Sequence, residues 1–344
     1  MASSNAFPAS FATCSIGTQP EHLLPLKLEA ISSAGFTAIE LAFPDLQTFA
    51  SQHFKRDVDA KDYDSLADAA TKVKTMCEVM ELKVLMLQPF SNFEGWEEGS
   101  EQRKDAFERA RGWIKIMQSV GTDMLQVGSS DSPSITSSRS QLASDLRELA
   151  DMLNEHGFRL AYENWCWATH APTWKDVWEI VKEVDRPNIG LCLDTFQTAG
   201  GEWGDPTTTS GLIERDGGRE ALEAQFRKSL EELTSTVPKD KIFLLQVSDA
   251  YKPPQPFDRA PDDSGLRPRG RWSHDFRPVP FGEGYLPVVD VARAVVRTGF
   301  QGWFSMEVFD GGPDGKGGYE DDMTVFAKKA MAAHKRLAEE CESG

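Results

Sequence analysis

NIGLCLDTFQTAG, residues 188–200, combines the pattern of a buried strand with a single acidic residue. Its first half is almost entirely apolar, and Asp194 follows directly after Leu193. A near-continuous apolar run of this length predicts a β-strand that is buried on both faces, as in parallel sheets. A carboxylate at the end of such a strand costs free energy unless a cation or hydrogen-bond donors meet it. Asp194 therefore predicts a polar site at the end of this strand.

Three further segments repeat the pattern of an apolar run that ends near an oxygen-bearing side chain: RLAYENWCW (159–167), KIFLLQVSDA (241–250) and GWFSMEVFDGG (302–312). The side chains concerned are Glu163, Gln246 and Glu307. If the four strands are neighbours in one barrel, these side chains and Asp194 converge. Three carboxylates and an amide oxygen at one place suit a hard divalent cation such as Mg, Mn or Co. The alternative is that the carboxylates pair with arginines across the mouth of the barrel.

The rest of the chain alternates strand and helix patterns. The first four strands are expected at 11–17, 38–43, 82–90 and 123–130, ahead of the four segments above. Amphipathic periodicity predicts eight helices, at 24–36, 62–80, 101–119, 137–157, 174–184, 218–233, 286–300 and 320–340. Eight strands that are each followed by a helix predict a closed (β/α)8 TIM barrel, in which the active site lies at the carboxyl ends of the strands.

We expect the whole chain, residues 1–344, to form this single α/β domain. The longest stretch without a strand or helix pattern is 250–285, which is rich in Pro, Gly and Arg. A loop that long in a compact domain is usually either functional or disordered. We therefore expect residues 250–285 to be a functional loop.

Composition excludes some classes of partner. The formal net charge of −17 argues against nucleic acid and anionic membranes as partners, and leaves small molecules. No run approaches the roughly 20 apolar residues of a membrane span. The N-terminus lacks the basic and apolar regions of a secretory signal. Five scattered cysteines without a CxxC pair favour a reducing compartment, so we expect a cytoplasmic protein.

The motifs YEN, LDTFQ, LLQVSDA and SMEVF, in this order, resemble the sugar-phosphate isomerase/epimerase superfamily of xylose-isomerase-like barrels. Within it, LQPFSNFEGW (87–96) and CLDTFQTAGGEWGDP (192–206) are similar to segments of the 3-dehydroshikimate dehydratases. The resemblance covers nearly the whole chain. It implies a metal-dependent lyase of quinate and shikimate catabolism, which converts 3-dehydroshikimate to protocatechuate and water through an enolate.

The resemblance also implies roles for individual residues. The ligands of one divalent metal would be Glu163, Asp194, Gln246 and Glu307. An arginine of the segment RPRGRWSHDFRPVPFGEGYLP would hold the substrate carboxylate, and the candidates are Arg267, Arg269 and Arg271. Further residues expected to contact the substrate are Gln88, Phe93 and Trp165.

The sequence departs from the family at the general base. Many relatives have a His three residues after the metal-binding Asp, and here that catalytic position holds Gln197, which cannot accept a proton. His274 in the arginine-rich loop and His170 after the Glu163 strand are the candidates for this role, because a histidine titrates near neutrality. Either one could instead be an ordinary exposed residue of a loop.

Two other functions fit the same pattern. A sugar or keto-acid isomerase or epimerase would use the same metal site but return the proton to carbon. A barrel that binds a ligand without turnover would lack the metal. In each case the chain acts alone or as a homo-oligomer. Glu40, within the apolar run AIELAF, either faces the site or pairs with a basic neighbour.

Overall fold

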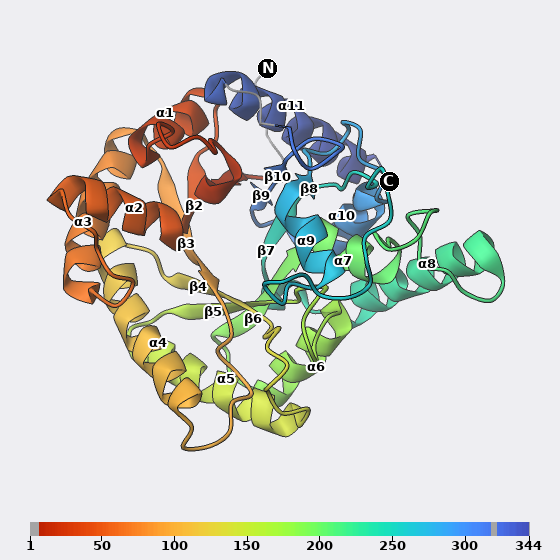
Figure 1. Ribbon diagram of the computed structural model, residues 1–344, viewed down its shortest axis with the longest axis horizontal. Coiled ribbons are helices and arrows are strands. Elements are labelled where there is room, and N and C mark those ends of the chain that lie inside the picture. The colour runs from red at the N-terminus through yellow and green to blue at the C-terminus, as the bar shows by residue number, and fades with distance from the viewer. Residues whose placement is uncertain (1–6, 318–321, 344) are drawn as a thin grey trace.

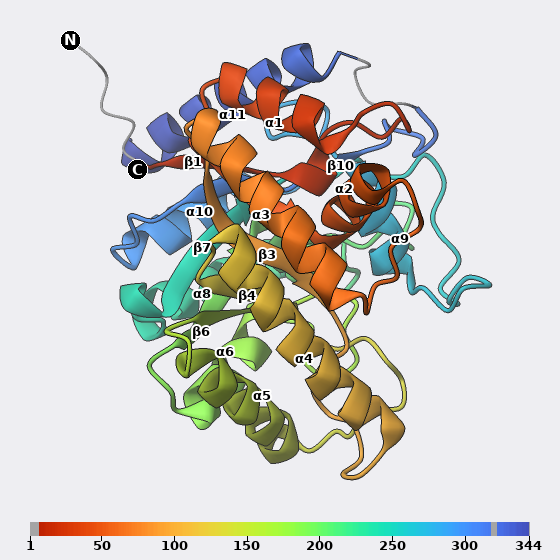
Figure 2. The same ribbon diagram turned by 90° about the vertical axis from the view of Figure 1, so that its left-hand side faces the viewer.

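A computed structural model describes residues 7–317 and 322–343. Eight parallel strands close into a barrel in the order of the chain, and the last of them returns to the first (Figures 1 and 2). The strands are β1 (Ala9–Ala12), β2 (Ala38–Ala42), β3 (Lys83–Phe90), β4 (Met124–Gly128), β5 (Arg159–Glu163), β6 (Ile189–Asp194), β7 (Ile242–Val247) and β9 (Phe304–Met306). The predicted (β/α)8 barrel is confirmed.

Eight long helices surround this barrel in a ring (Figure 1). They are α1 (Leu24–Ser33), α3 (Tyr63–Val79), α4 (Glu101–Val120), α5 (Arg139–Asn154), α6 (Trp174–Val184), α8 (Gly218–Thr236), α10 (Val288–Arg297) and α11 (Met323–Glu342). Each coincides with a predicted helix to within a few residues at either end. No helix in the described part of the chain is both long and apolar enough to cross a membrane.

The boundaries of the helices follow from local sequence signals. At α4 the side chain of Ser100 accepts a hydrogen bond from the backbone N–H of Arg103, and Gly121 ends the helix with a φ of 80°. At α6 Thr173 and Asp176 form a reciprocal capping box. Capping side chains satisfy backbone N–H groups that lack partners within the helix, and glycine adopts positive φ without strain. These signals explain why the long helices were predictable.

Three further helices and a small sheet were not predicted. The helices are α2 (Phe43–Phe54), α7 (Thr195–Glu202) and α9 (Pro268–Asp275). The strands β8 (Phe276–Arg277) and β10 (Phe309–Asp310) pair antiparallel beside the barrel. Two 3-10 turns complete the elements, η1 (Thr13–Ser15) and η2 (Lys239–Lys241). The elements α9 and β8 give the segment 250–285 a regular part, so the prediction of a stretch without secondary structure was wrong there.

The first strand begins and ends earlier than expected. The sequence predicts a strand over 11–17, whereas β1 ends at Ala12 and the 3-10 turn η1 follows. The hydroxyl of Thr13 accepts a hydrogen bond from the backbone N–H of Ala42, 3.0 Å away, at the end of β2. The chain therefore turns at Thr13, where a side chain takes over the hydrogen bonding of the strand. Apolar composition alone does not show that change.

The interior of the barrel has two layers of different chemistry. We call the lower one the apolar layer; it consists of Ala38, Leu85, Met86, Met124, Ala161, Cys192 and Leu244. The upper one, which we call the polar layer, lies toward the carboxyl ends of the strands; it consists of Glu40, Gln88, Gln126, Glu163, Asp194, Gln246 and Glu307. Six polar-layer residues follow an apolar-layer residue of the same strand by two positions. Side chains two apart on a strand point to the same face, so both layers fill the barrel.

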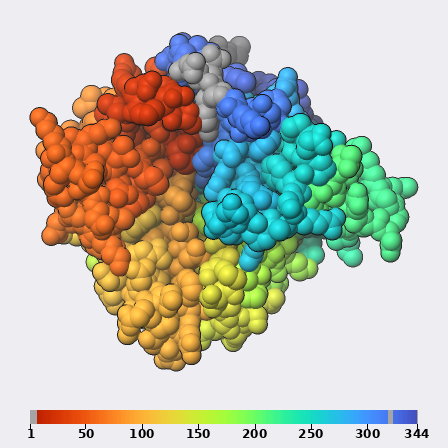
Figure 3. All heavy atoms as spheres, in the orientation of Figure 1, coloured from red at the N-terminus to blue at the C-terminus, as the bar shows by residue number. Residues whose placement is uncertain are grey.

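The segment after β7 lies over the carboxyl ends of the strands. Its helix α9 projects inside the ring of elements, on the side of α7 and α10, when the barrel is viewed as in Figure 1. In the space-filling view its cyan atoms stand opposite the orange atoms of the N-terminal elements, with an indentation between them (Figure 3). The mouth of the barrel is thus bordered by this segment on one side and by the elements around β2 and β3 on the other.

Candidate metal centre

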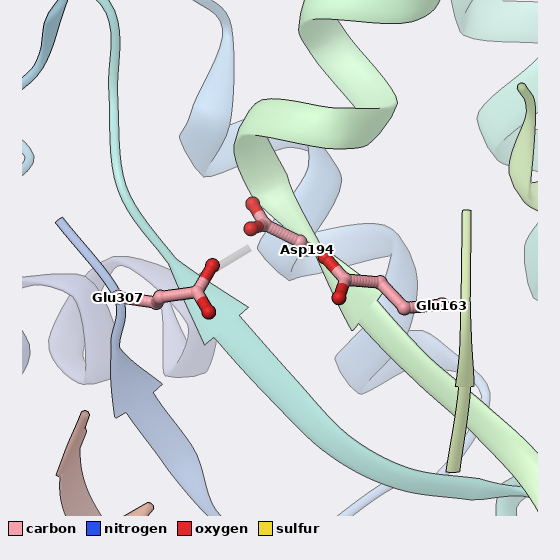
Figure 4. A group of neighbouring side chains, drawn as sticks. All are labelled: Glu163, Asp194 and Glu307. Atoms are coloured by element: carbon pink, nitrogen blue, oxygen red, sulfur yellow. The ribbon is translucent and has the colours of Figure 1, made fainter. Parts of the chain in front are cut away.

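Three carboxylates meet in the polar layer. Glu163 and Asp194 are the last residues of β5 and β6, and Glu307 directly follows β9. One carboxylate oxygen from each lies within 4.8 Å of the others, and all three residues are buried. Figure 4 shows the three side chains pointing into a common space. Because parallel strands end at the same rim of a barrel, residues far apart in sequence converge here.

Asp194 has one oxygen for the backbone and one for a cation. Its Oδ1 accepts hydrogen bonds from the N–H groups of Phe196 (2.6 Å) and Gln197 (3.3 Å), so Asp194 is also the N-cap of α7. Its Oδ2 accepts a hydrogen bond from Arg277. The N-terminus of a helix favours a negative charge through its exposed N–H groups. The strand and the following helix together fix the position of the Asp194 carboxylate at the site.

Arg277 of β8 is the cation that contacts the cluster. Its Nη2 forms ion pairs with Asp194 and, at 3.0 Å, with Glu307 Oε2, and its side chain is 1 % exposed. Its Nε donates to Ser248 Oγ at 2.8 Å. Burial opposes the charge of the guanidinium, but the carboxylates of Asp194 and Glu307 outweigh burial and hold the pKa of Arg277 above its ordinary value. The alternative predicted from the sequence, pairing with arginine, is therefore present for two of the three carboxylates.

Hydrogen bonds across the barrel connect the cluster to β2 and β3. The amide nitrogen of Gln246 donates to Glu307 Oε1 at 3.0 Å and to Glu40 Oε2 at 2.8 Å. The amide nitrogen of Gln88 donates to the same Glu307 oxygen at 3.2 Å. Of the two alternatives that the sequence left open for Glu40, facing the site or pairing with a basic neighbour, the structure shows the first. Since Gln246 presents its nitrogen, ligation of a metal by its oxygen requires the amide to rotate by about 180°.

Burial raises the pKa values of three glutamates of the polar layer, Glu40, Glu163 and Glu307. Burial is the main cause that raises the pKa of Glu40 to about 8 and the pKa of Glu307 to about 7. Burial also raises the pKa of Glu163 well above its ordinary value, and the negative charges of Glu307 and Asp194 add to the effect. The shifts measure how strongly the site disfavours its own negative charge, because each ionised carboxylate lacks water and has like charges nearby.

The donor set fits a divalent cation. Three carboxylates face one guanidinium, so the site has an excess of negative charge when all three are ionised. Two buried oxygens, Glu163 Oε1 and Glu40 Oε1, have no hydrogen-bond partner within the described residues. Unpartnered buried oxygens are costly, and oxygen ligands are those that Mg, Mn and related ions prefer. A metal ion at this place would satisfy both the charge and the free oxygen of Glu163.

A family model described as "Xylose isomerase-like TIM barrel" matches residues 28–329 of the chain. The chain belongs to this family. The match includes every strand of the barrel except β1 and all three carboxylates of the cluster. Members of this xylose isomerase-like family are typically metal-dependent, and the buried carboxylates are compatible with such a site.

Two curated relatives have the same name. A 3-dehydroshikimate dehydratase of Neurospora crassa is 34% identical over 305 residues, which cover 84% of this chain and 82% of that protein. A 3-dehydroshikimate dehydratase of Pseudomonas aeruginosa is 31% identical over 304 residues, which cover 88% of this chain but only 38% of the bacterial protein. Among solved structures, an IolI protein with a bound zinc atom has the same fold, with a TM-score of 0.64, 18% identity and 98% coverage of both chains.

The predicted substrate residues of this xylose isomerase-like barrel lie at different depths. Gln88 contacts the cluster, as described above, and Trp165 Nε1 donates to Glu163 Oε2 at 3.2 Å. Phe93 is 1 % exposed and packs against Phe90 and Phe107, with ring centroids 5.9 and 4.9 Å apart. Two of the three residues therefore touch the cluster, whereas Phe93 packs in the core beside α4.

The three predicted arginines donate hydrogen bonds to backbone carbonyls of helix α7 and of loops around the mouth. Arg267 donates to Trp167 O at 2.6 Å, Arg269 donates to Gly200 O at 2.8 Å, and Arg271 donates to Asp258 O at 2.6 Å. The structure brings a fourth arginine of the same segment, Arg277, to the carboxylates instead. No local sequence signal distinguishes Arg277 from the other three arginines, because the choice depends on how the segment folds back over the barrel.

The predicted catalytic residues are also spread out. Gln197 is buried, and its Oε1 accepts a hydrogen bond from the N–H of Cys166 at 2.9 Å. His170 is exposed on the loop after β5. His274 is exposed too, and its ring meets that of Trp167 edge-on with centroids 6.4 Å apart. Partial removal of this ring from water lowers the pKa of His274 below its ordinary value. Within the described part of the chain, His274 is the one of the two histidines with a ring contact to the wall of the mouth.

Proposed function

We propose that this chain is a divalent-metal-dependent 3-dehydroshikimate dehydratase. The observation that carries the proposal is the buried cluster of Glu163, Asp194 and Glu307, whose three carboxylates, when ionised, carry more negative charge than Arg277 neutralises. The relatives named 3-dehydroshikimate dehydratase support the reaction, above all the Neurospora crassa protein, of which the chain covers 82%. The activity is a lyase reaction that produces protocatechuate and water from one substrate.

The metal would be held by Glu163, Asp194 and Glu307, with Gln246 as the fourth ligand after rotation of its amide. Mg, Mn and Co are the candidate ions, because the donor atoms are oxygens. When bound, the ion would polarise the ketone oxygen of the substrate and stabilise negative charge that develops there. The raised pKa values of Glu163 and Glu307 support this role, since a cation restores the ionised form.

The base in this proposal is His274. Its lowered pKa keeps the imidazole neutral near pH 7, as a proton acceptor must be. The imidazole removes a proton from the carbon beside the ketone, and the electron pair of the broken C–H bond moves to the oxygen. The β-hydroxyl then leaves with a proton returned by the imidazolium, which makes one water molecule. Loss of a second ring proton to the oxygen completes the aromatic ring of protocatechuate.

The walls of the mouth would position the substrate ring and its carboxylate. Trp165 and Trp167 stack with centroids 5.1 Å apart, and His274 meets Trp167. Arg267 also contacts Trp167, through the backbone carbonyl, and is the candidate among the three arginines for the substrate carboxylate. A guanidinium matches the geometry of a carboxylate. An apolar wall of this kind limits the access of water to the carbanion.

The test is the formation of protocatechuate, followed by its absorbance, from 3-dehydroshikimate by chelator-treated protein with Mg, Mn or Co added. Metal-dependent product that disappears in Glu163→Ala and Glu307→Ala is the expected result. Stoichiometric metal binding without product would contradict the dehydratase and direct the assay to keto-sugars and an isomerase reaction. A protein that binds no metal would contradict the centre itself and favour a barrel without turnover.

Other properties of the protein stay predictions. The five cysteines are all unpaired, in agreement with the reducing cytoplasm expected from their spacing. The proposed substrate is a small anion, and the net charge of −17 keeps nucleic acid and anionic membranes outside the proposal. We expect the protein to act alone or as a homo-oligomer.

A further inference from the structure

The two oxygens of the Glu163 carboxylate have different surroundings. Oε2 accepts hydrogen bonds from the amide nitrogen of Gln126 and from Trp165 Nε1, the latter at 3.2 Å. Oε1 is buried and has no hydrogen-bond partner among the described residues. Glu163 and Gln126 are each 1 % exposed, so both side chains lie inside the barrel. One oxygen is therefore fixed by the protein, and the other is free to bind a ligand.

The first donor comes from the neighbouring strand. Gln126 lies on β4, where it is the partner of Ala161 in the register of β4 with β5. Two residues further along each strand, Gly128 is the partner of Glu163. Side chains two apart share a face of the strand, so Gln126 points into the barrel just below Glu163. Its position is set by the sheet and does not depend on any loop.

The second donor is held in place by contacts on several sides. The backbone N–H of Trp165 donates to Ser129 Oγ at 2.9 Å, and its ring stacks on Trp167 at 5.1 Å and 18°. Trp167 is fixed in turn, because its Nε1 donates to Asp131 Oδ2 at 3.2 Å. The backbone of Trp165 is thus fixed by Ser129, and its indole cannot swing away from Glu163 without breaking the stack on Trp167.

Gly128 makes room for this arrangement. A Cβ atom at Gly128 would lie 2.2 Å from Cε2 and 2.7 Å from Nε1 of Trp165, which is closer than real Cβ contacts occur. The Trp165 edge that carries the donor therefore occupies the space that any other residue at 128 would fill. Gly128 has an ordinary backbone conformation without positive φ, so its close contact with the indole is the reason for glycine here.

From this geometry we infer that Gln126 and Trp165 are positioning residues that make Glu163 a one-oxygen metal ligand. Their two hydrogen bonds fix the rotation of the carboxylate, so that Oε1 alone is presented to the ion. Outer-shell donors of this kind orient a ligand and typically change metal affinity by about 10–100-fold when removed. The inference rests on the metal centre of the proposed function and adds to it the residues that set the affinity.

The experiment measures the Kd of Mn²⁺ for chelator-treated protein by calorimetry, without substrate. Trp165→Phe removes only the donor N–H and keeps an aromatic ring, and Gln126→Leu removes the other donor. We expect each to raise the Kd by about 10–100-fold. Gly128→Ala, which leaves both donors present but displaces the indole, should raise it as well. Because both donors bind one oxygen, the double variant should lose less than the product of the two single effects.

The matched control is Trp178→Phe. Trp178 is a buried tryptophan of α6 whose Nε1 has no hydrogen-bond partner among the described residues, so the Kd should stay unchanged. A purely structural role of Trp165 would change the urea midpoint of the metal-free protein and leave the Kd as it was. An unchanged Kd in both Trp165→Phe and Gly128→Ala, or an equal shift in Trp178→Phe, would overturn the inference.

Failure of the proposed function gives a different result. Wild-type protein that binds Mn²⁺ but forms no protocatechuate would refute the dehydratase, and the ranking of the Kd values would still decide the role of Trp165 and Gln126. Wild-type protein that does not bind Mn²⁺, Mg²⁺ or Co²⁺ would refute both.

Discussion

The apolar layer and the polar layer of the barrel lie on neighbouring positions of the same strands, mostly two residues apart. They differ in polarity and in the presence of ionisable groups. Met124 and Gln126 on β4, and Leu244 and Gln246 on β7, are such pairs. The apolar layer makes contacts that stabilise any folded barrel. The polar layer contains carboxylates whose pKa values burial has raised, and three buried oxygens, of Glu40, Gln126 and Glu163, that have no hydrogen-bond partner among the described residues.

This difference shows which layer the fold needs and which layer the site needs. Burial of like charges in one small volume destabilises the folded chain unless a cation binds. Replacing a functional polar group in such a place commonly raises stability and lowers function. We therefore expect substitutions in the polar layer to change chemistry more than folding, and substitutions in the apolar layer to do the opposite.

The largest expected effect is on turnover in Glu307→Gln. This change keeps the shape of the side chain but removes a metal ligand and a charge. Removing a residue that only orients a ligand lowers activity by up to ~100-fold, so we expect loss of a ligand to lower it further, by roughly 1000-fold or more. The metal-free variant should be at least as stable as the wild type, since one buried charge is gone. The rate of protocatechuate formation measures the activity, and urea unfolding in the presence of chelator measures the stability of the metal-free protein. A variant that loses stability but keeps its activity would show that this polar-layer residue serves the fold and not the chemistry.

Arg277→Leu should have the largest effect on stability. It leaves Asp194 and Glu307 without their cation, and breaking a buried ion pair from one side costs about 3–5 kcal/mol. Because a divalent ion supplies the missing charge, saturating Mn²⁺ should restore much of the loss, which unfolding with and without metal would measure. Arg271→Leu is the control: Arg271 is bound to a loop carbonyl and should change stability by about 0.5 kcal/mol at most. Equal losses in the two variants would show that the carboxylates do not need Arg277.

Met124→Ala tests the apolar layer. Removal of a buried methionine side chain typically costs about 2–5 kcal/mol, and we expect a value near 3 kcal/mol here. The Kd of Mn²⁺ should change less than twofold, although Met124 is on the same strand as Gln126. Calorimetry and urea unfolding on the same preparation give both numbers. A large change in Kd would mean that the two layers are not independent.

The smallest expected effect is the change in the free energy of unfolding of the metal-free protein for each unit of pH. The pKa values of Glu40, about 8, and Glu307, about 7, lie above the ordinary 4.5. Between about pH 4.5 and 8 the folded state therefore holds more protons than the unfolded state, so stability falls as pH rises. The slope is at most about 1.4 kcal/mol per pH unit for each carboxyl. Unfolding at several pH values in chelator should show this slope. It should be smaller in Glu40→Gln and with bound Mn²⁺, and a rise in stability over this range would contradict the raised pKa values.

The sequence predicted most of the barrel because its signals are local. Apolar runs, amphipathic periods and caps such as Ser100 and Thr173 lie within a few residues of the elements they define. The same logic found Glu163, Asp194 and Glu307, since an acidic residue at the end of an apolar run stands out. These three residues lie at the carboxyl ends of β5, β6 and β9, as the pattern of apolar runs predicts.

The parts that were missed depend on contacts between distant segments. Gln126 is one polar residue within a strand, and nothing nearby in sequence indicates that it contacts Glu163. Arg277 lies 83 residues from Asp194, at the end of a segment in which three other arginines were equally plausible. The short helix α7 contains Gly200 and Gly201, which favour a loop by propensity, yet the carboxylate of Asp194 caps it. Tertiary contacts decided each case.

The hydrogen bonds that cross the barrel have a consequence for the order in which the molecule forms. Gln246 and Glu40 are 206 residues apart in the chain, and Gln88 and Glu307 are 219 apart. Contacts of such long sequence separation form late, because the intervening chain must be ordered first. A ribosome-bound chain that has not yet exposed β9 lacks Glu307 and cannot complete the cluster. Metal binding would therefore indicate that the barrel has closed. A signal that responds to bound metal during refolding would measure the time at which closure occurs.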